Sequence, residues 1–290
     1  MPRSRPSEAP PSGSAPEIAL VLGAGGARGL SHIAVLEAFD ELGLKPARIS
    51  GCSIGAIIGA AYAAGLSGRE LREHVLATFR DRARVIARLL DCRVGKLADL
   101  VRGLGNPVLI DGERLLDLFW PEAVPDHFEE LTIPFTAVAA DYHRHSEVTL
   151  HDGPLTPAVA ASLAIPGLIR PVALGGRVLI DGGAIDPLPY RKLLAPGRIV
   201  VAVDVSAPMT EPGEARIPGA MEALVGASQI LTRTLVQRLI EQEPPDVLIR
   251  AGADRIGGLD FFKAKAILAA AEPTKDEVKR ALERALEAPG

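Results

Sequence analysis

The sequence has no long uncharged apolar run of the kind that crosses a membrane. Among its 290 residues, no stretch reaches the roughly 18 apolar residues of a spanning helix without a charge or a glycine. The opening segment, MPRSRPSEAPPSGSAPE, also lacks the apolar centre of a secretion signal. We therefore expect a cytoplasmic protein in which residues 1–16 form a disordered tail rich in Pro and Ser.

Cysteine, aromatic residues and excess positive charge are also scarce. The two cysteines, Cys52 and Cys92, are too few for a disulfide framework or a zinc cluster, and they fit a reducing compartment. Aromatic residues make up 4% of the chain, and 32 Lys and Arg against 36 Asp and Glu give a formal net charge of −4. Because nucleic-acid binding needs basic surface and stacking platforms, we expect no nucleic-acid partner.

Apolar strand-like runs alternate with helical segments along most of the chain. The strand-like runs are EIALVL, ARIS, IPFTAVAAD, SEVTLH, GRVLID, RIVVAVDV and DVLIRAG. Strands that are separated by helices must cross over, so the pattern predicts a three-layer α/β/α domain with a mostly parallel central sheet. We place this domain at residues 17–275 and a C-terminal helix and tail at residues 276–290.

Residues 80–130 interrupt this alternation with a helical, basic segment that is broken by Gly and Pro, and we predict an inserted helical cap there. Its first part, residues 80–102, mixes apolar residues with many charges. The charged residues are Arg80, Arg82, Arg84, Arg88, Arg93, Lys96 and Arg102, against Asp81, Asp91 and Asp99. The pattern fits either a solvated amphipathic helix pair or a basic rim in peripheral contact with an anionic membrane surface.

A serine lies between two glycines in GCSIG, directly after a short strand-like run. A chain that passes from strand to helix within about one residue strains the backbone there and lifts that side chain clear of the sheet. The flanking positions then have no room for side chains, which suits Gly51 and Gly55. In a chain with 29 glycines, the pentapeptide taken alone fits an ordinary turn as well as a nucleophile elbow around Ser53.

Two more apolar strands end in glycines. In LGAGGARGL, a glycine-rich turn offers backbone N–H groups at a helix N-terminus, and Arg28 stands where a dinucleotide fingerprint needs its last glycine. In VLIDGGAIDPLP, Asp181 ends a strand before two glycines. In an open α/β sheet the ligand crevice lies at the carboxyl ends of the strands. The three ends therefore offer a nucleophile, a base and oxyanion donors, as acyl transfer requires.

Four blocks in this order resemble the bacterial patatin-like phospholipases: GAGGARG, GCSIG, AASLAIPGLIRPV, and DGG followed by DPLP. The resemblance covers roughly residues 17–275. It implies a patatin-like α/β fold and a serine acyl hydrolase acting on lipid esters such as phospholipids, lysophospholipids or acylglycerols. It also implies a catalytic dyad of serine and aspartate without histidine, and no cofactor or metal.

Position by position, the resemblance makes Ser53 the nucleophile and Asp181 the base. The glycine-rich loop would form the oxyanion hole, with residues Gly25, Gly26, Ala27 and Arg28. Ala24 stands where the family's loop usually has a glycine. Pro166 would lie in a wall of the acyl site, although a proline there fits a helix end equally well.

Three other functions remain open on the sequence alone. A Ser-Asp-His triad would need an acid and then a histidine after Ser53, and Asp141 with His151 satisfies that order. However, DYHRHSEVTLHDG predicts a polar hairpin with surface histidines (His143, His145, His151), and His32 suits a packing or supporting role better than that of a base. An acyltransferase would use the same dyad, and a non-catalytic lipid- or protein-binding module could share the fold.

Overall fold

The computed structural model describes residues 16–94, 109–206, 217–252 and 256–287. Within these ranges, eight strands form one sheet in the order β10-β9-β1-β2-β5-β8-β7, with β6 paired to β5. The parallel part consists of β1 (Glu17–Leu22), β2 (Arg48–Cys52), β5 (Phe135–Asp141), β9 (Arg198–Asp204) and β10 (Val247–Arg250). The antiparallel part consists of β6 (Ser146–Leu150), β7 (Val172–Leu174) and β8 (Arg177–Asp181).

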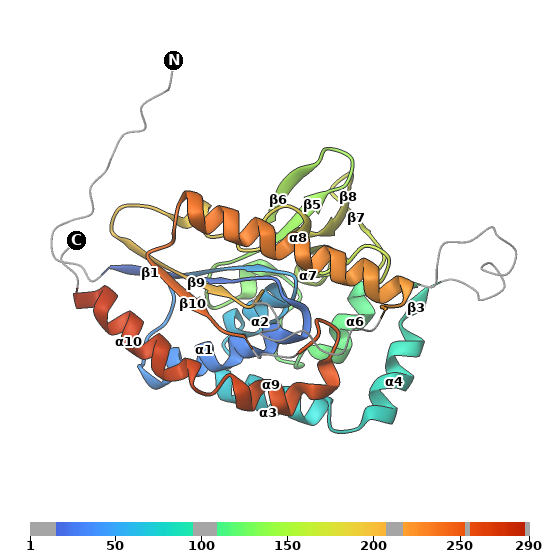
Figure 1. The fold of residues 1–290 in the computed structure, drawn as a ribbon, viewed down its shortest axis with the longest axis horizontal. Coiled ribbons are helices and arrows are strands. Elements are labelled where there is room, and N and C mark those ends of the chain that lie inside the picture. The colour runs from blue at the N-terminus through green and yellow to red at the C-terminus, as the bar shows by residue number, and fades with distance from the viewer. Residues whose placement is uncertain (1–15, 95–108, 207–216, 253–255, 288–290) are drawn as a thin grey trace, which may run out of the picture.

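Helices cover both faces of the sheet, which confirms the predicted three-layer α/β/α architecture. In Figure 1, α8 (Ala220–Gln242) runs above the sheet. Below it lie α1 (His32–Glu41), α2 (Ile54–Ala63), α3 (Gly68–Thr78), α9 (Ala264–Ala270) and α10 (Thr274–Glu287). The alternation along β1 explains the two layers, because Leu20 and Leu22 enter the core on the α1 and α2 side while Ala19 and Val21 pack toward α8.

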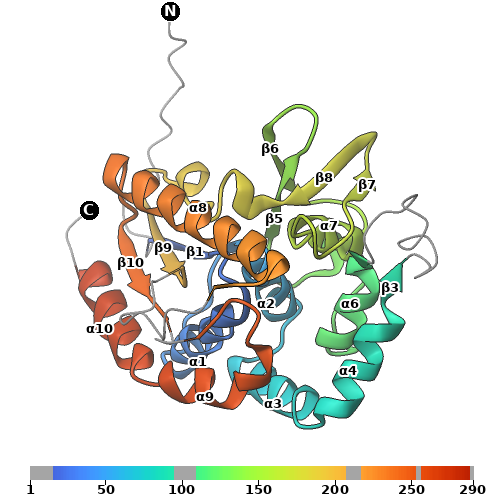
Figure 2. The ribbon, with the colours of Figure 1, turned by 45° about the vertical axis from the view of Figure 1, so that its right-hand side comes forward.

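The region of the predicted cap contains two helices, α4 (Arg82–Asp91) and α6 (Gly112–Phe119). They are joined at their ends by a short antiparallel pair, β3 (Arg93–Val94) and β4 (Leu109–Ile110). Figure 2 shows α6 between α4 and α7 (Leu155–Ser162), at the side of the molecule. Lys96, Asp99 and Arg102 of the predicted basic segment lie outside the described residues, as do residues 1–15 of the predicted tail.

The C-terminal helix is part of the α/β domain. The predicted boundary at residues 275 and 276 falls inside α10, whose Val278 and Leu282 are fully buried and whose neighbours are α1 and β10. The boundary was wrong because α10 is mostly polar with one apolar stripe. The sequence alone does not show that this stripe packs against the α/β domain. Within the four described ranges, none of the helices combines the length and the apolar composition of a membrane span.

Candidate active site

Ser53 occupies a sharp turn between β2 and α2. Its backbone angles, φ 55° and ψ −119°, are ones that residues with a side chain rarely adopt. A side chain at either flanking glycine would meet backbone atoms. A Cβ on Gly51 would lie 2.5 Å from the Gly55 carbonyl oxygen, and one on Gly55 would collide with the Leu22 carbonyl oxygen. The backbone therefore has the strained strand-to-helix geometry that a nucleophile elbow requires.

The Ser53 hydroxyl donates a hydrogen bond to the carboxylate of Asp181, with 2.7 Å between Oγ and Oδ2. The other carboxylate oxygen, Oδ1, accepts the N–H of Gly183 at 2.7 Å. Both side chains are buried, at 5% and 7% exposure for Ser53 and Asp181. A serine and an aspartate that are 128 residues apart in the sequence thus form a directly bonded pair.

The strand that carries Asp181 reaches this point from an unexpected direction. In a parallel sheet the carboxyl ends of the strands meet at one edge, but β8 is antiparallel to β5. Asp181 pairs with Ala139 of β5. The preceding residue of β5, Val138, pairs on its other side with Cys52 of β2, directly before Ser53. Because β8 runs back along β5 and stops at that level, its last residue lies beside Ser53. The parallel-edge rule therefore explains the position of Ser53 and not that of Asp181.

Burial changes the acid–base behaviour of this pair. It raises the pKa of the Asp181 carboxyl to about 6, and the hydrogen bonds from Ser53 and Gly183 act in the opposite direction by stabilising the charged form. At neutral pH the carboxyl is still mostly ionised, and it is a stronger base than an exposed aspartate.

The glycine-rich loop is held by backbone hydrogen bonds on both sides of its centre. Three N–H groups donate to carbonyls of neighbouring segments: Gly23 to Val203 (3.1 Å), Ala24 to Pro187 (2.8 Å) and Ala27 to Gly258 (2.8 Å). Within the described ranges, the N–H groups of Gly25 and Gly26 donate to no protein acceptor, and both glycines line a crevice with Ser53 and Asp181. Ala27 was among the expected oxyanion donors, but its N–H is already bonded to the Gly258 carbonyl and is not free to bind an oxyanion.

Arg28 lies beside the loop, and its side chain points toward α8. It is 8% exposed, and one terminal nitrogen lies 3.5 Å from the Gln229 side-chain oxygen. The arginine lines the same crevice as the two glycines. The Arg28 side chain therefore adds a positive charge to the crevice beside Ser53.

Ser162 supports the turn at Ser53, a contact that the sequence analysis missed. Its hydroxyl accepts the Ser53 N–H at 2.9 Å and donates to the Val138 carbonyl at 2.6 Å. Ser162 is fully buried at the end of α7. The available signal was a hydroxyl in the otherwise apolar run AVAASLAI, since a buried polar group needs a partner.

Replacing Ser162 by alanine should lower the free energy of unfolding by about 1–3 kcal/mol, because it leaves the buried Ser53 N–H without an acceptor. Chemical denaturation measures the change. The matched control is Ser31→Ala, because the Ser31 hydroxyl is equally buried and has no hydrogen-bond partner among the described residues. That control should be nearly neutral, and an equal loss in both variants would contradict the role given to Ser162.

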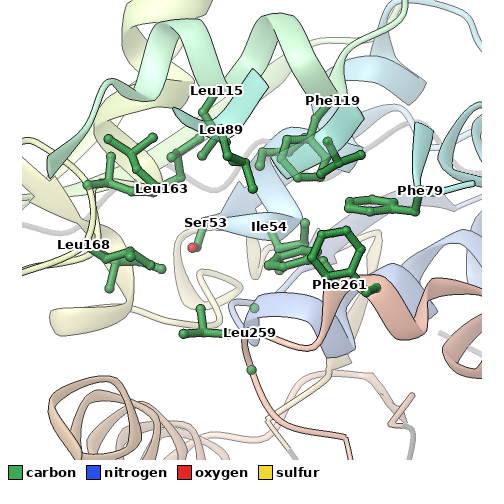
Figure 3. Close-up of a pocket in the computed structure, with 18 residues that line it drawn as sticks. Ser53, Ile54, Phe79, Leu89, Leu115, Phe119, Leu163, Leu168, Leu259 and Phe261 are labelled. Atoms are coloured by element: carbon green, nitrogen blue, oxygen red, sulfur yellow. The ribbon is translucent and has the colours of Figure 1, made fainter. Parts of the chain in front are cut away.

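An apolar cavity opens on one side of Ser53. It has a volume of about 220 Å³. Figure 3 shows Ser53 facing it, with aromatic and leucine side chains around it from α4, α6, the end of α3, the turn after α7 and the segment before α9. Labelled members of the lining are Phe79, Leu89, Leu115, Phe119, Leu168 and Phe261. The cavity offers a hydrocarbon chain an apolar environment that begins at the serine.

Pro166 does not line this cavity, contrary to the expectation that it forms a wall. The chain turns after α7, with the Leu168 N–H donating to the Ile165 carbonyl at 3.0 Å. Ile165 and Leu168 face the cavity, whereas Pro166 is exposed on the outside of the turn. The block was correctly placed near the site, but the orientation of a residue within a turn could not be read from the sequence.

A more polar crevice adjoins the cavity at Ser53. The crevice that contains Gly25, Gly26 and Arg28 is also lined by Ser206 after β9 and by polar residues of α8. The α8 residues are Ser228, Gln229 and Thr232. An apolar cavity and a polar crevice therefore meet at one hydroxyl, an arrangement that suits an ester with an apolar acyl part and a polar alcohol part.

The three histidines of the predicted hairpin are not part of this arrangement. His143, His145 and His151 are exposed on the β5–β6 hairpin, which confirms the predicted polar hairpin. Asp141 is bonded to Arg144 at 2.9 Å, so the alternative triad of Ser53, Asp141 and His151 is not assembled.

Comparison with known proteins places these features in a family context. A model of the family described as patatin-like phospholipase matches residues 20–194. An uncharacterized NTE family protein of Mycobacterium tuberculosis is 38% identical over 204 residues, which cover 70% of this chain and 52% of that protein. Lysophospholipase NTE1 of Cryptococcus neoformans is 33% identical over 193 residues, which cover 65% of this chain and 11% of that protein.

The chain thus spans about half the length of the mycobacterial relative and a small part of the fungal one. Among solved structures, VipD from Legionella pneumophila superposes with a TM-score of 0.46 at 13% identity, over 92% of this chain and 67% of that one.

Proposed function

Because the chain belongs to the patatin-like phospholipase family, we propose that it is a serine acyl hydrolase that cleaves carboxylic esters of lipids. The observation that carries the proposal is the 2.7 Å hydrogen bond from the Ser53 hydroxyl to the buried Asp181 carboxylate. In this proposal Ser53 is the nucleophile, Asp181 is the general base, and the N–H groups of Gly25 and Gly26 stabilise the oxyanion.

The proposed reaction has two halves that use the same groups. Asp181 takes the Ser53 proton as Oγ attacks the ester carbonyl carbon, and the resulting oxyanion accepts hydrogen bonds from the loop. Collapse of the tetrahedral intermediate breaks the bond to the alcohol oxygen, which leaves with the proton from Asp181. Water then loses a proton to Asp181 as it attacks the acyl carbon of the acyl-enzyme. The second tetrahedral intermediate collapses by breaking the bond to Ser53 Oγ, Asp181 returns the proton to Oγ, and the carboxylic acid is released. An acceptor alcohol in place of water would give acyl transfer by the same steps.

The two sides of the site support a lipid as substrate. The apolar cavity suits the acyl chain, and the crevice beside Arg28 and α8 suits a polar alcohol part. This combination favours phospholipids, lysophospholipids or acylglycerols over small esters, whose transfer from water into an apolar cavity gains less free energy.

The proposal is tested by activity against phospholipids, lysophospholipids, acylglycerols and short esters, together with labelling by a fluorophosphonate probe. We expect labelling and hydrolysis of at least one lipid class, with Ser53→Ala as the blank. A folded wild-type protein that neither labels nor hydrolyses any ester would favour the binding-module alternative. Product analysis with added alcohols separates hydrolysis from acyl transfer.

The rate should depend on pH through the Asp181 carboxyl. A protonated carboxyl cannot accept the Ser53 proton, and burial raises the pKa of Asp181 to about 6. Activity should therefore be low below that value, rise with pH through about 6 and level off above about 7. A profile of kcat/KM against pH from 4.5 to 8.5 measures this.

A second buried carboxyl provides the control for that profile. Burial and the nearby Glu147 raise the pKa of Asp186 to about 6 as well, but Asp186 does not line the crevice at Ser53. Asp186→Asn should therefore keep the rise near pH 6. If the rise disappears in that variant, Asp181 is not the group that controls it.

We also propose that α4 makes peripheral contact with anionic membranes. One side of the helix faces inward, where Val85 and Leu89 line the apolar cavity. The outer side exposes Ile86 at 49% and Leu90 at 48%. A helix with apolar groups on both sides can contact lipid while it lines the path of the acyl chain.

Basic residues flank the exposed apolar edge of α4. Arg84 and Arg88 are exposed one turn apart, whereas Arg82 packs over the Phe262 ring at 4.8 Å. A basic residue near an anionic membrane surface contributes about 1 kcal/mol of binding free energy. Arg84 and Arg88 are therefore the residues whose charge can be changed with the least effect on the cavity wall.

Replacing both Arg84 and Arg88 by glutamate should weaken binding to anionic vesicles by about 30-fold or more, given about 1 kcal/mol for each lost charge. Sedimentation with phosphatidylglycerol and phosphatidylcholine vesicles at two salt concentrations measures it. The matched control is Arg280→Glu with Arg284→Glu, an exposed pair at the same spacing on α10. Binding that ignores lipid charge, salt and the α4 change would contradict the proposal.

A further inference from the structure

His32 is a fully buried histidine at the start of α1, next to the glycine-rich loop. Its Nε2 lies 2.9 Å from the carbonyl oxygen of Gly23, the residue that precedes the loop's centre. A carbonyl oxygen can only accept, so the imidazole must carry its proton on Nε2 and donate it. The contact thus fixes the tautomer of a neutral histidine.

The other ring nitrogen, Nδ1, makes no hydrogen bond to the described residues that would offset its burial. Burial also lowers the pKa of His32 to about 4, so the ring stays uncharged at neutral pH. A side chain needed only for packing could be apolar and would avoid an unsatisfied acceptor. The hydrogen bond to Gly23, the one bond that His32 makes to the described residues, therefore offers a reason for a histidine at this position.

Together with a second hydrogen bond, the bond to Gly23 holds one peptide group of the loop at both of its polar ends. The carbonyl of Gly23 accepts from His32, while the N–H of the same peptide group, which belongs to Ala24, donates to the Pro187 carbonyl at 2.8 Å. The next peptide group along the chain carries the N–H of Gly25. The orientation of the held group therefore sets where the Gly25 N–H points.

We propose that His32 is a positioning residue for the oxyanion hole, acting through the Gly23 carbonyl on the N–H groups of Gly25 and Gly26. The inference rests on the proposed hydrolase function and adds to it a residue that touches neither substrate nor Asp181. A base role does not fit, because the proton on Nε2 is engaged with Gly23 and the structure shows no bond from His32 to Ser53.

The test compares His32→Leu with His32→Gln in the full chain, using a lipid ester that the wild type hydrolyses and Ser53→Ala does not. Leucine removes the donor, whereas the glutamine amide can place an N–H at about the position of Nε2. We expect kcat to fall about 10- to 100-fold in His32→Leu, since small misplacement of catalytic donors costs rates of that order. KM should stay within about threefold, and His32→Gln should recover most of kcat.

His74 provides a matched control, because its Nε2 also bonds a backbone carbonyl, that of Phe119, at 2.8 Å. His74→Leu should keep kcat within about threefold of the wild type. Equal losses in His74→Leu and His32→Leu, unchanged kcat in His32→Leu, or no recovery in His32→Gln would each overturn the proposal. If the wild type itself neither labels nor hydrolyses, the proposed function fails together with this inference.

If His32→Leu does not fold, the wild-type protein still tests the inference. A long-range ¹H–¹⁵N spectrum reports the tautomer of each histidine ring, with His32→Gln identifying the signal. We expect a neutral ring protonated on Nε2 from pH 8 down to pH 5.5. A ring protonated on Nδ1, or charged in that range, would overturn the proposed donation to Gly23.

Discussion

Replacing Asp181 by asparagine is expected to lower kcat by about 10²–10⁴ while the fold is kept. Asparagine has nearly the same shape, and its oxygen can still accept the Gly183 N–H that Asp181 accepts at 2.7 Å. The amide is not a base, so it cannot take the Ser53 proton as Oγ attacks. Steady-state kinetics on the best lipid ester measures the loss, and circular dichroism and thermal unfolding report whether the fold is intact.

The same experiment separates the dyad from the histidine triad. A triad of Ser53, Asp141 and His151 would make His151→Ala inactive and leave Asp181→Asn active. The dyad predicts the reverse, because His151 is exposed on the hairpin. Turnover at the wild-type level in Asp181→Asn would rule out the dyad.

Replacing Gly26 by valine should lower kcat by about 10²–10³, the usual cost of losing an oxyanion donor. Gly26 has a φ of +60°, and a Cβ there would collide with the Gly258 carbonyl oxygen. That carbonyl accepts the N–H of Ala27, so the collision would displace the loop at its anchor. Rates of fluorophosphonate labelling and of hydrolysis should fall together, because both pass through an oxyanion.

Gly43 supplies the control for backbone strain. It has a similar φ of +65°, but nothing lies within 4 Å of a Cβ placed there. Gly43→Val should therefore lose stability and keep kcat.

Ala24→Gly should also be tolerated, because it restores the residue usual in the family's loop. If Ala24→Gly inactivates a folded enzyme, the assignment of the loop to the oxyanion hole is wrong.

The sequence predicts those features of the site that depend on a few neighbouring residues. It does not predict how residues far apart in the chain come into contact. The turn at Ser53 and the glycine loop follow from steric demands within a few residues, and those demands are visible as glycines. The position of Asp181 depends on β8 running antiparallel to β5, which is a property of the whole sheet. Which residues face inward at the end of α7 and in the turn after it likewise depends on what packs against them. The sequence therefore shows neither the exposure of Pro166 nor the buried contact of Ser162.

Residues that lie after the last motif also help to build the site. The family match ends at residue 194, but β1 is paired on its far side with β9, which begins at Arg198. The Ala27 N–H is bonded to Gly258, and Phe261 completes the cavity. A fragment that stops at the last motif would keep Ser53, Asp181 and every loop glycine. It would also expose the edge of β1, leave the Ala27 N–H without its acceptor and remove part of the cavity wall, so the residues after 194 belong to the structure that supports the site.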